Sequence, residues 1–256
     1  MISVIIPTYN EEKAIGDTIK RLVAGFSADA ASPKPAIPYE IIITDDKSTD
    51  NTVAVARTAA AESGAQNLVI ILAHETKHAT IAQNRNAGAK IARGDLLVFM
   101  DSDCVIENMN ESLTHAISLF EKDPKLVALT GKLGVLPEFE TWGDRVVYFF
   151  FNLVHFFKNN IFHTGEASGK FQMITHNAFL KVNGYREDLV TREDADMFWR
   201  LLKVGRTYYD SSIIVRHTGR RAHKLGWPKL LSIWMIETFW VMIFNKSRVK
   251  IWKDIR

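Results

Sequence analysis

The segment at residues 96–103 constrains the fold more than any other part of the chain. Residues 96–100 are five consecutive apolar residues without helical spacing, which predicts a short strand buried on both faces. The run ends directly in Asp101-Ser102-Asp103, so two carboxylates stand at the carboxyl end of this strand. In an open parallel α/β sheet, ligands bind at that end. Neighbouring carboxylate oxygens attract a hard divalent cation, so we expect Asp101 and Asp103 to hold Mg²⁺ or Mn²⁺.

The first hundred residues alternate between strand and helix patterns. Apolar runs at residues 3–7, 39–44 and 68–72 predict three further strands, and a helical pattern follows each of them. Thr80 is expected to cap the third of these helices, and Gly94 to end it. A proline-rich surface loop is expected at residues 32–38. The alternation predicts an α/β fold with a right-handed, doubly wound, mostly parallel sheet flanked by helices. The acidic turns at residues 45–46 and 101–103 would then share one edge of the sheet.

The second half of the chain is less regular and rich in aromatic residues. Strands are expected at residues 127–130 and 212–216. Residues 146–157 form an uncharged aromatic stretch of twelve residues, well short of the roughly 20 that span a bilayer. A buried core helix and a helix that faces lipid or an acceptor both fit this pattern. An amphipathic helix is expected at residues 230–244. The basic residues that follow it suit anionic lipid, although a helix docked on the sheet explains the apolar part equally well: Lys246, Arg248, Lys250, Lys253 and Arg256.

Composition excludes some classes of protein. The formal net charge of +3 over 256 residues is too small to indicate nucleic acid binding. The dinucleotide and P-loop glycine motifs are absent from the sequence. The single cysteine, Cys104, cannot form an internal disulfide, and the first residues do not resemble a secretory signal. We therefore expect a cytoplasmic location.

The residues at the expected strand ends suggest chemistry with a nucleotide. A cation at residues 101–103 could bridge two phosphates and stabilise a departing diphosphate. Tyr9 could stack on a base, Asp45 could accept a hydrogen bond from it, and Arg85 could neutralise phosphate or position the acidic residues. His217 is either a further metal ligand or a structural histidine. Asp194, near the start of a helix and expected on its core-facing side, is either a general base for an incoming hydroxyl or a capping residue reaching toward Thr191.

Five motifs in register resemble the family 2 glycosyltransferases of GT-A fold over most of residues 1–217. The motifs are Ile5-Ile6-Pro7-Thr8-Tyr9-Asn10-Glu11-Glu12, Thr44-Asp45-Asp46-Lys47-Ser48-Thr49-Asp50-Asn51-Thr52, Arg85-Asn86-Ala87-Gly88 with Ala92-Arg93-Gly94-Asp95, Asp101-Ser102-Asp103, and Glu193-Asp194. The chain departs from the family at Lys47 and at His78-Ala79-Thr80, where glycines are common. It also lacks the Gln-x-x-Arg-Trp signature of processive synthases, which favours a single addition.

The resemblance implies an inverting, metal-dependent transfer from a UDP- or GDP-sugar. We assign residues 1–103 to a nucleotide-binding half and 104–217 to an acceptor-side half of one catalytic domain, with a basic loop and C-terminal helix at 218–256 in the same domain. Asp194 is the expected base, and Asp101, Asp103 and His217 the expected metal ligands. The donor-binding residues would be Pro7, Tyr9, Glu11, Asp45, Arg85, Asp101, Ser102 and Asp103. The acceptor-side residues would be Glu193, Arg220 and Arg221.

The acceptor is the least constrained part of this prediction. A base favours a sugar hydroxyl, whereas an ionised polyprenyl phosphate needs none. The aromatic stretch and the basic C-terminus favour a lipid-linked or cell-surface glycan at the inner face of the cell membrane, with peripheral membrane contact. Two more remote alternatives are a phosphatase of the haloacid dehalogenase type, which also uses a strand ending in D-x-D, and a non-catalytic protein that binds sugar nucleotides.

Overall fold

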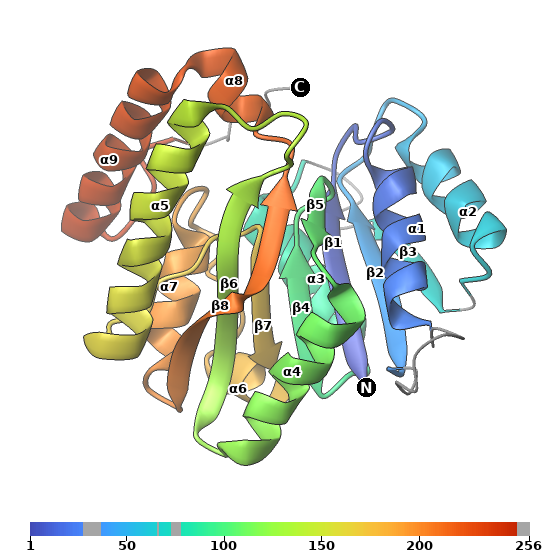
Figure 1. Cartoon of the computed structure of the whole chain (residues 1–256), viewed down its shortest axis with the longest axis horizontal. Helices are drawn as coiled ribbons and strands as arrows, with labels where there is room; N and C mark the ends of the chain where they lie inside the picture. Colours follow the sequence, from blue (N-terminus) through green and yellow to red (C-terminus); the bar gives the residue numbers. More distant parts are fainter. Residues whose placement is uncertain (28–36, 66, 73–77, 250–256) are drawn as a thin grey trace.

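The computed structural model describes residues 1–27, 37–65, 67–72 and 78–249 (Figure 1). Most of the loop expected at residues 32–38 lies outside these ranges, as do the basic residues Lys250, Lys253 and Arg256.

One eight-stranded mixed sheet runs through the molecule in the order β3-β2-β1-β4-β7-β6-β8-β5. Its strands are β1 (Ile2–Thr8), β2 (Tyr39–Asp45), β3 (Leu68–Leu72), β4 (Leu96–Met100), β5 (Cys104–Ile106), β6 (Leu126–Val135), β7 (Phe171–Thr175) and β8 (Arg206–His217). The four strands β3, β2, β1 and β4 are parallel, with Ile5 of β1 between Ile42 of β2 and Phe99 of β4. β7 then pairs antiparallel with both β4 and β6, while β6 and β8 are parallel. The predicted mostly parallel α/β sheet is confirmed, and β1, β2 and β4 end at the same edge.

Helices cover both faces of this sheet, because each strand buries apolar side chains on both sides. On one face α1 (Ile15–Phe26), α2 (Thr52–Glu62) and α4 (Met109–Lys122) pack in one buried cluster with residues such as Val4 and Val98. On the other face α3 (Ile81–Ile91), α6 (His176–Lys181) and α7 (Glu193–Leu201) pack around Ile5 and Phe99. Thr80 caps α3 as predicted, in a capping box with Gln83. Gly94 lies very close to the backbone of β1: a Cβ added at this position would lie 2.6 Å from the backbone nitrogen of Ser3, so only glycine fits.

The aromatic helix α5 (Trp142–Phe156) and the π-helical turn η1 (Phe157–Ile161) stand at one side of the sheet (Figure 1). The buried residues of α5 are mostly polar: Asp144, Tyr148, Asn152 and His155. Its large apolar side chains instead face outward, among them Phe149, Phe150, Val154 and, just beyond η1, Phe162. The helix is therefore not buried on all sides: Tyr148 and Phe151 pack on the core, and the other side of α5 is exposed. Contact of the exposed side with lipid or an acceptor stays a prediction.

The C-terminal helices α8 (Arg220–Leu225) and α9 (Trp227–Phe244) lie beside α5. The prediction of an amphipathic α9 is wrong, because its apolar side chains lie on both the packed and the exposed sides. The inward side carries the charge: Glu237 is buried and accepts hydrogen bonds from Arg248 and Thr191. Met242, at 74% exposure, is one of several apolar residues on the outward side. Across the described ranges, no helix combines the length and apolar character needed to cross a membrane.

Candidate active site

A single cleft of about 880 Å³ opens at the edge where β1 and β4 end, and it extends to α9. Twelve of the thirteen predicted site residues line it: Pro7, Tyr9, Glu11, Arg85, Asp101, Ser102, Asp103, Glu193, Asp194, His217, Arg220 and Arg221. The exception is Asp45. Side chains that lie more than a hundred positions apart in the sequence are therefore gathered in one place by the topology of the sheet.

Asp45 does not face the cleft, so the structure does not support its predicted contact with a base. Its buried carboxylate accepts hydrogen bonds from the Ser48 hydroxyl at 2.6 Å, the Ser48 backbone nitrogen at 2.9 Å and the Thr8 hydroxyl at 3.2 Å. These bonds use the carboxylate to close the turn after β2. The next residue, Asp46, lines the cleft instead and accepts a hydrogen bond from the Ala79 backbone nitrogen at 2.7 Å. Tyr9 and His78 stand beside it with their rings edge to face at 5.2 Å.

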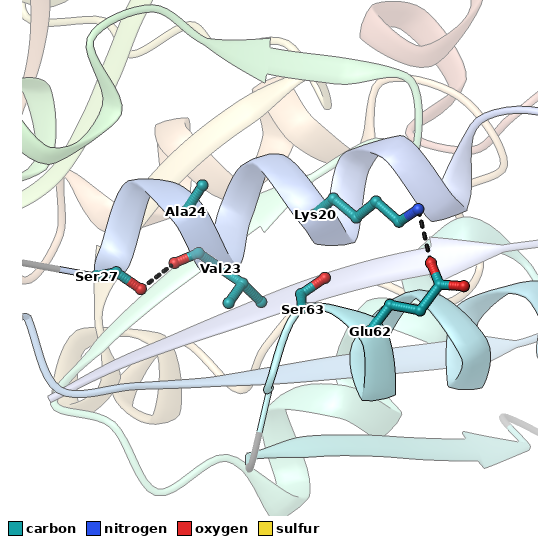
Figure 2. A pocket seen from close by; sticks show the side chains of 6 residues that line it. All are labelled: Lys20, Val23, Ala24, Ser27, Glu62 and Ser63. Atoms are coloured by element: carbon teal, nitrogen blue, oxygen red, sulfur yellow. Dashed lines mark hydrogen bonds and ion pairs between the residues drawn. The ribbon is translucent and has the colours of Figure 1, made fainter. Parts of the chain in front are cut away.

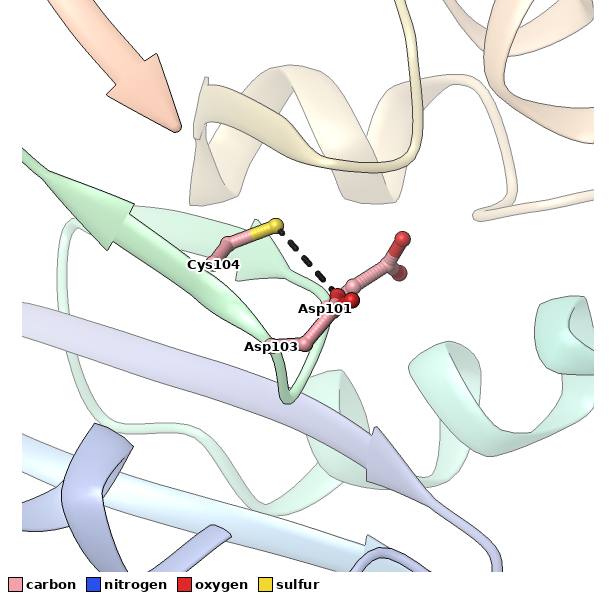
Figure 3. A group of neighbouring side chains, drawn as sticks. All are labelled: Asp101, Asp103 and Cys104. Atoms are coloured by element: carbon pink, nitrogen blue, oxygen red, sulfur yellow. Dashed lines mark hydrogen bonds between the residues drawn. The ribbon is translucent and has the colours of Figure 1, made fainter. Parts of the chain in front are cut away.

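The acidic turn, residues 101–103, provides the candidate metal site. Ligand atoms of Asp101, Asp103 and Cys104 lie within 4.8 Å of one another (Figure 3). Burial raises the pKa of the Cys104 thiol well above its usual range, so the thiol stays protonated and donates to Asp103 Oδ1 at 3.9 Å. Because a protonated thiol is a poor ligand and carboxylate oxygens suit hard cations, the two carboxylates fit Mg²⁺ or Mn²⁺.

His217 lines the cleft, but both of its ring nitrogens are engaged. The Gly219 backbone nitrogen donates to Nδ1 at 3.0 Å, so Nε2 carries the hydrogen and donates to the Tyr148 hydroxyl at 2.6 Å. Burial lowers the pKa of His217 to about 2, which keeps the ring neutral. The structure does not support the predicted role of His217 as a metal ligand, because α5 brings Tyr148 onto the nitrogen that a metal would need.

Arg220 holds the start of α8 close to the acidic turn. Its guanidinium pairs with Glu11 through two bonds of 2.6 and 2.9 Å, and its Nε lies 3.4 Å from Asp103. Thr218 donates to the same Asp103 carboxylate at 2.5 Å. In the structure Arg220 is engaged by Glu11, which follows β1, and by Asp103, so its predicted contact with the acceptor stays a prediction.

Arg85 lies beneath the cleft and organises the carboxylates around it. The side chain is 1% exposed and donates to Glu193 at 3.0 Å, to Asp101 at 3.3 Å and to the Gly169 carbonyl at 3.1 Å. Burial, reinforced by repulsion from Asp194, raises the pKa of Glu193 to about 7, although Arg85 opposes the shift. Burial and the neighbouring carboxylates therefore favour the protonated form of Glu193.

Asp194 faces the cleft at the start of α7. Its carboxylate accepts hydrogen bonds from the Gly169 and Ala195 backbone nitrogens, both at 2.8 Å. The capping alternative is not observed, because α7 begins at Glu193 and Arg192 occupies the cap position with a φ of 65° and no side-chain cap bond. The bond to Gly169 fixes the orientation of the carboxylate, which leaves it suited to act as a base toward a ligand in the cleft.

Sequence reasoning missed two parts of this site. One is Lys170, which could have been found only from the pairing of β7 with β4. The other is the apolar wall of the cleft, contributed by α5 and α9: Tyr148, Phe151, Leu230, Leu231, Trp234, Met235 and Phe239. The apolar runs were visible in the sequence, but not the face that each helix turns toward the cleft.

A second, smaller hollow lies between α1 and α2 (Figure 2). Its polar groups satisfy one another: Lys20 pairs with Glu62 at 2.8 Å, and the Ser27 hydroxyl donates to the Val23 carbonyl at 2.9 Å. We assign it no chemistry.

Solved structures with the same architecture define the fold. A mannosyltransferase, PcManGT from Pyrobaculum calidifontis in complex with GDP-Man and Mn²⁺, superposes with a TM-score of 0.74 at 17% identity, covering 97% of this chain and 65% of that one. S. aureus TarS 1-349 in complex with UDP-GlcNAc gives a TM-score of 0.60 at 21% identity, covering 83% and 57% of the two chains. The fold is thus that of a GT-A glycosyltransferase.

The chain belongs to glycosyl transferase family 2, whose model matches residues 3–181. The family predicted from the sequence is confirmed, and the phosphatase alternative is wrong. Similar curated proteins include the undecaprenyl-phosphate 4-deoxy-4-formamido-L-arabinose transferases of Pseudomonas fluorescens (strain SBW25), 29% identical over 147 residues, and of Sodalis glossinidius (strain morsitans), 33% identical over 129 residues. The two matches cover 57% and 49% of this chain, and 40% and 35% of those relatives. The chain therefore matches less than half the length of these relatives.

Proposed function

We propose that this protein transfers one sugar from a nucleotide-sugar donor to an acceptor that carries an apolar lipid. The observation that carries the proposal is the continuity of the cleft, which joins the acidic turn, Asp194 and the apolar wall. A polar end suits the donor diphosphate and the reacting groups, whereas an apolar end suits a hydrocarbon chain.

The donor would lie at the end of the cleft formed by β1 and β4. Asp101 and Asp103 would hold Mn²⁺ or Mg²⁺, which when bound supplies positive charge to the diphosphate leaving group. Tyr9 and Asp46 would contact the base, one by stacking and the other by accepting a hydrogen bond. The complexes of PcManGT with GDP-Man and Mn²⁺ and of TarS with UDP-GlcNAc support a donor of this class.

Asp194 would act as the general base toward an acceptor hydroxyl. Its carboxylate lines the cleft between the acidic turn and the apolar wall, and the hydrogen bond from Gly169 fixes its direction. Removing the hydroxyl proton as the new glycosidic bond forms would complete an inverting displacement in which the nucleoside diphosphate leaves.

A polyprenyl phosphate is the second candidate acceptor. The similar curated proteins are named for transfer to undecaprenyl phosphate. Lys170, Arg192 and Arg221 line the cleft and could attract a phosphate group. Such an acceptor is already ionised, so it would not need Asp194 as a base.

The outward faces of α5, η1 and α9 would rest on a membrane surface. Their exposed apolar residues include Phe149, Phe150, Phe162, Phe239 and Met242. These helices also form the apolar wall, so a membrane on this side would bring the lipid directly to the cleft. Replacing Phe149 and Met242 by Ser should reduce cosedimentation with phosphatidylglycerol vesicles; unchanged binding, or no binding by the unmodified protein, would refute the membrane contact.

The test of function is release of nucleotide from a panel of UDP- and GDP-sugars, with Mn²⁺ or Mg²⁺, and with a lipid-linked sugar or undecaprenyl phosphate as acceptor. Asp194→Asn should lower turnover with a hydroxyl acceptor by about 10²-fold or more while leaving donor binding intact. With a phosphate acceptor the same variant should retain turnover within a few fold. Asp188→Asn, which changes an exposed carboxylate near α7, is the matched control. Donor binding without acceptor-dependent release under any condition would favour the non-catalytic alternative.

A further inference from the structure

Lys170 occupies a defined position next to the acidic turn. β7 pairs antiparallel with β4 so that Phe171 lies opposite Met100. Extending this register by one residue places Lys170 opposite Asp101, and facing residues of an antiparallel pair project from the same side of a sheet. Lys170 also lines the cleft. Lys170 is thus the last residue of the turn that leads into β7, next to the acidic turn that follows β4.

The charge of Lys170 is not neutralised by a direct ion pair. Arg85 is paired with Glu193 and Asp101, and Arg220 with Glu11 and Asp103. Within the described ranges, by contrast, no carboxylate lies within 4.0 Å of Lys170 Nζ. Burial alone would lower the pKa of this ammonium, but the carboxylates of Asp101 and Asp103 are among the groups that raise it, and the net shift is upward, so Lys170 is charged.

Lys170 lines the same cleft as the acidic turn and the apolar wall. Its register places it next to Asp101, and Tyr148 of the apolar wall is among the groups that act on its charge. An ammonium group on a flexible stem offers three donors and suits phosphate oxygens. A partly enclosed cation without a direct partner therefore favours an anionic ligand at this point.

We propose that Lys170 contacts a phosphate group of a substrate bound in the cleft. The source of that phosphate rests on the proposed function: either the diphosphate of the nucleotide-sugar or the phosphate of a lipid acceptor. In both cases the ammonium group neutralises the negative charge of the phosphate, which the carboxylates of the acidic turn would otherwise repel.

The test compares the unmodified protein with Lys170→Gln, Lys170→Arg and a matched control, Lys181→Gln, at the exposed end of α6. Calorimetry with UDP and GDP, each with Mn²⁺, reports the donor site. Calorimetry with farnesyl phosphate and with farnesol reports the acceptor site and separates the phosphate from the apolar chain. Thermal unfolding of each variant confirms that it is folded.

Lys170→Gln should weaken binding at least tenfold for one class of phosphate probe, and Lys170→Arg should recover most of that loss. Loss confined to the nucleotides assigns the contact to the donor. Loss confined to farnesyl phosphate, with farnesol unchanged, assigns it to the acceptor. If the unmodified protein binds these probes and folded Lys170→Gln binds them equally well, the role of Lys170 is refuted and the proposed function stands. If the unmodified protein binds neither nucleotides nor farnesyl phosphate, both proposals fail.

Discussion

At pH 8, where Glu193 with its pKa of about 7 is ionised, replacing Arg85 by Met should destabilise the protein by about 3–5 kcal/mol, the range measured when one partner of a buried ion pair is removed. Arg85 is 1% exposed, and the substitution leaves the buried Glu193 carboxylate and the Gly169 carbonyl without their donor. Asp101 contributes less to the loss, because its side chain is 36% exposed and water can reach it. The free energy of unfolding would be measured by urea titration followed through tryptophan fluorescence.

Two comparisons make this prediction specific. Arg206→Met removes an arginine whose pair with Asp123 is more than one-third exposed on both sides, so it should destabilise the protein much less than Arg85→Met. The double variant Arg85→Met with Glu193→Leu removes both buried charges and should be more stable than Arg85→Met alone. A loss below about 1 kcal/mol for Arg85→Met, or full additivity in the double variant, would refute the argument that one guanidinium compensates these carboxylates.

Three further predictions concern stability, pH and metal binding. Gly94→Ala should destabilise the fold by about 1–3 kcal/mol in the same urea assay, because its Cβ would press on the Ser3 backbone; an unchanged midpoint would contradict this. The pKa of Glu193 is raised from 4.5 to about 7 in the folded protein, so the native state binds the extra proton and stability should fall as pH rises from about 4.5 to 7. Glu193→Gln should make stability depend less on pH in thermal melts run with EDTA. An equally steep loss of stability in this variant would show that other groups cause the pH dependence. Asp103→Asn should weaken Mn²⁺ binding at least tenfold by calorimetry, whereas Cys104→Ala should leave it unchanged because the thiol is protonated; equal effects would refute the carboxylate assignment.

The strands and the gathering of the site could be predicted because both depend on local patterns. Runs such as residues 96–100 are apolar on both faces, and only a sheet covered by helices on both sides buries them. Once β1, β2 and β4 are parallel, the residues that follow them must meet at one edge. The placement of Tyr9, Arg85 and Asp103 around one cleft follows from that topology.

The sequence could not show those features that depend on which partners a side chain finds in the folded chain. Asp45 and Asp46 are adjacent carboxylates in the sequence, and only the bonds from Ser48 and Thr8 show which of them is used to close the turn. His217 ends a strand as predicted, but its free nitrogen is taken by Tyr148, a residue 69 positions earlier. The contacts of Asp45 with Thr8 and of His217 with Tyr148 are set by long-range packing and leave no periodic signal.

Buried polar contacts connect the C-terminal helices to the acidic turn and hold these parts of the site together. Asp144 of α5 accepts hydrogen bonds from His223 of α8 at 2.8 Å and from the Trp227 indole of α9 at 2.9 Å. Arg220, at the start of α8, is in turn paired with Glu11 and close to Asp103. Because Asp144 is fully buried and bonded to both helices, α5, α8 and α9 are held as one unit against the end of β1. The apolar wall is thereby kept in a fixed position relative to the acidic turn.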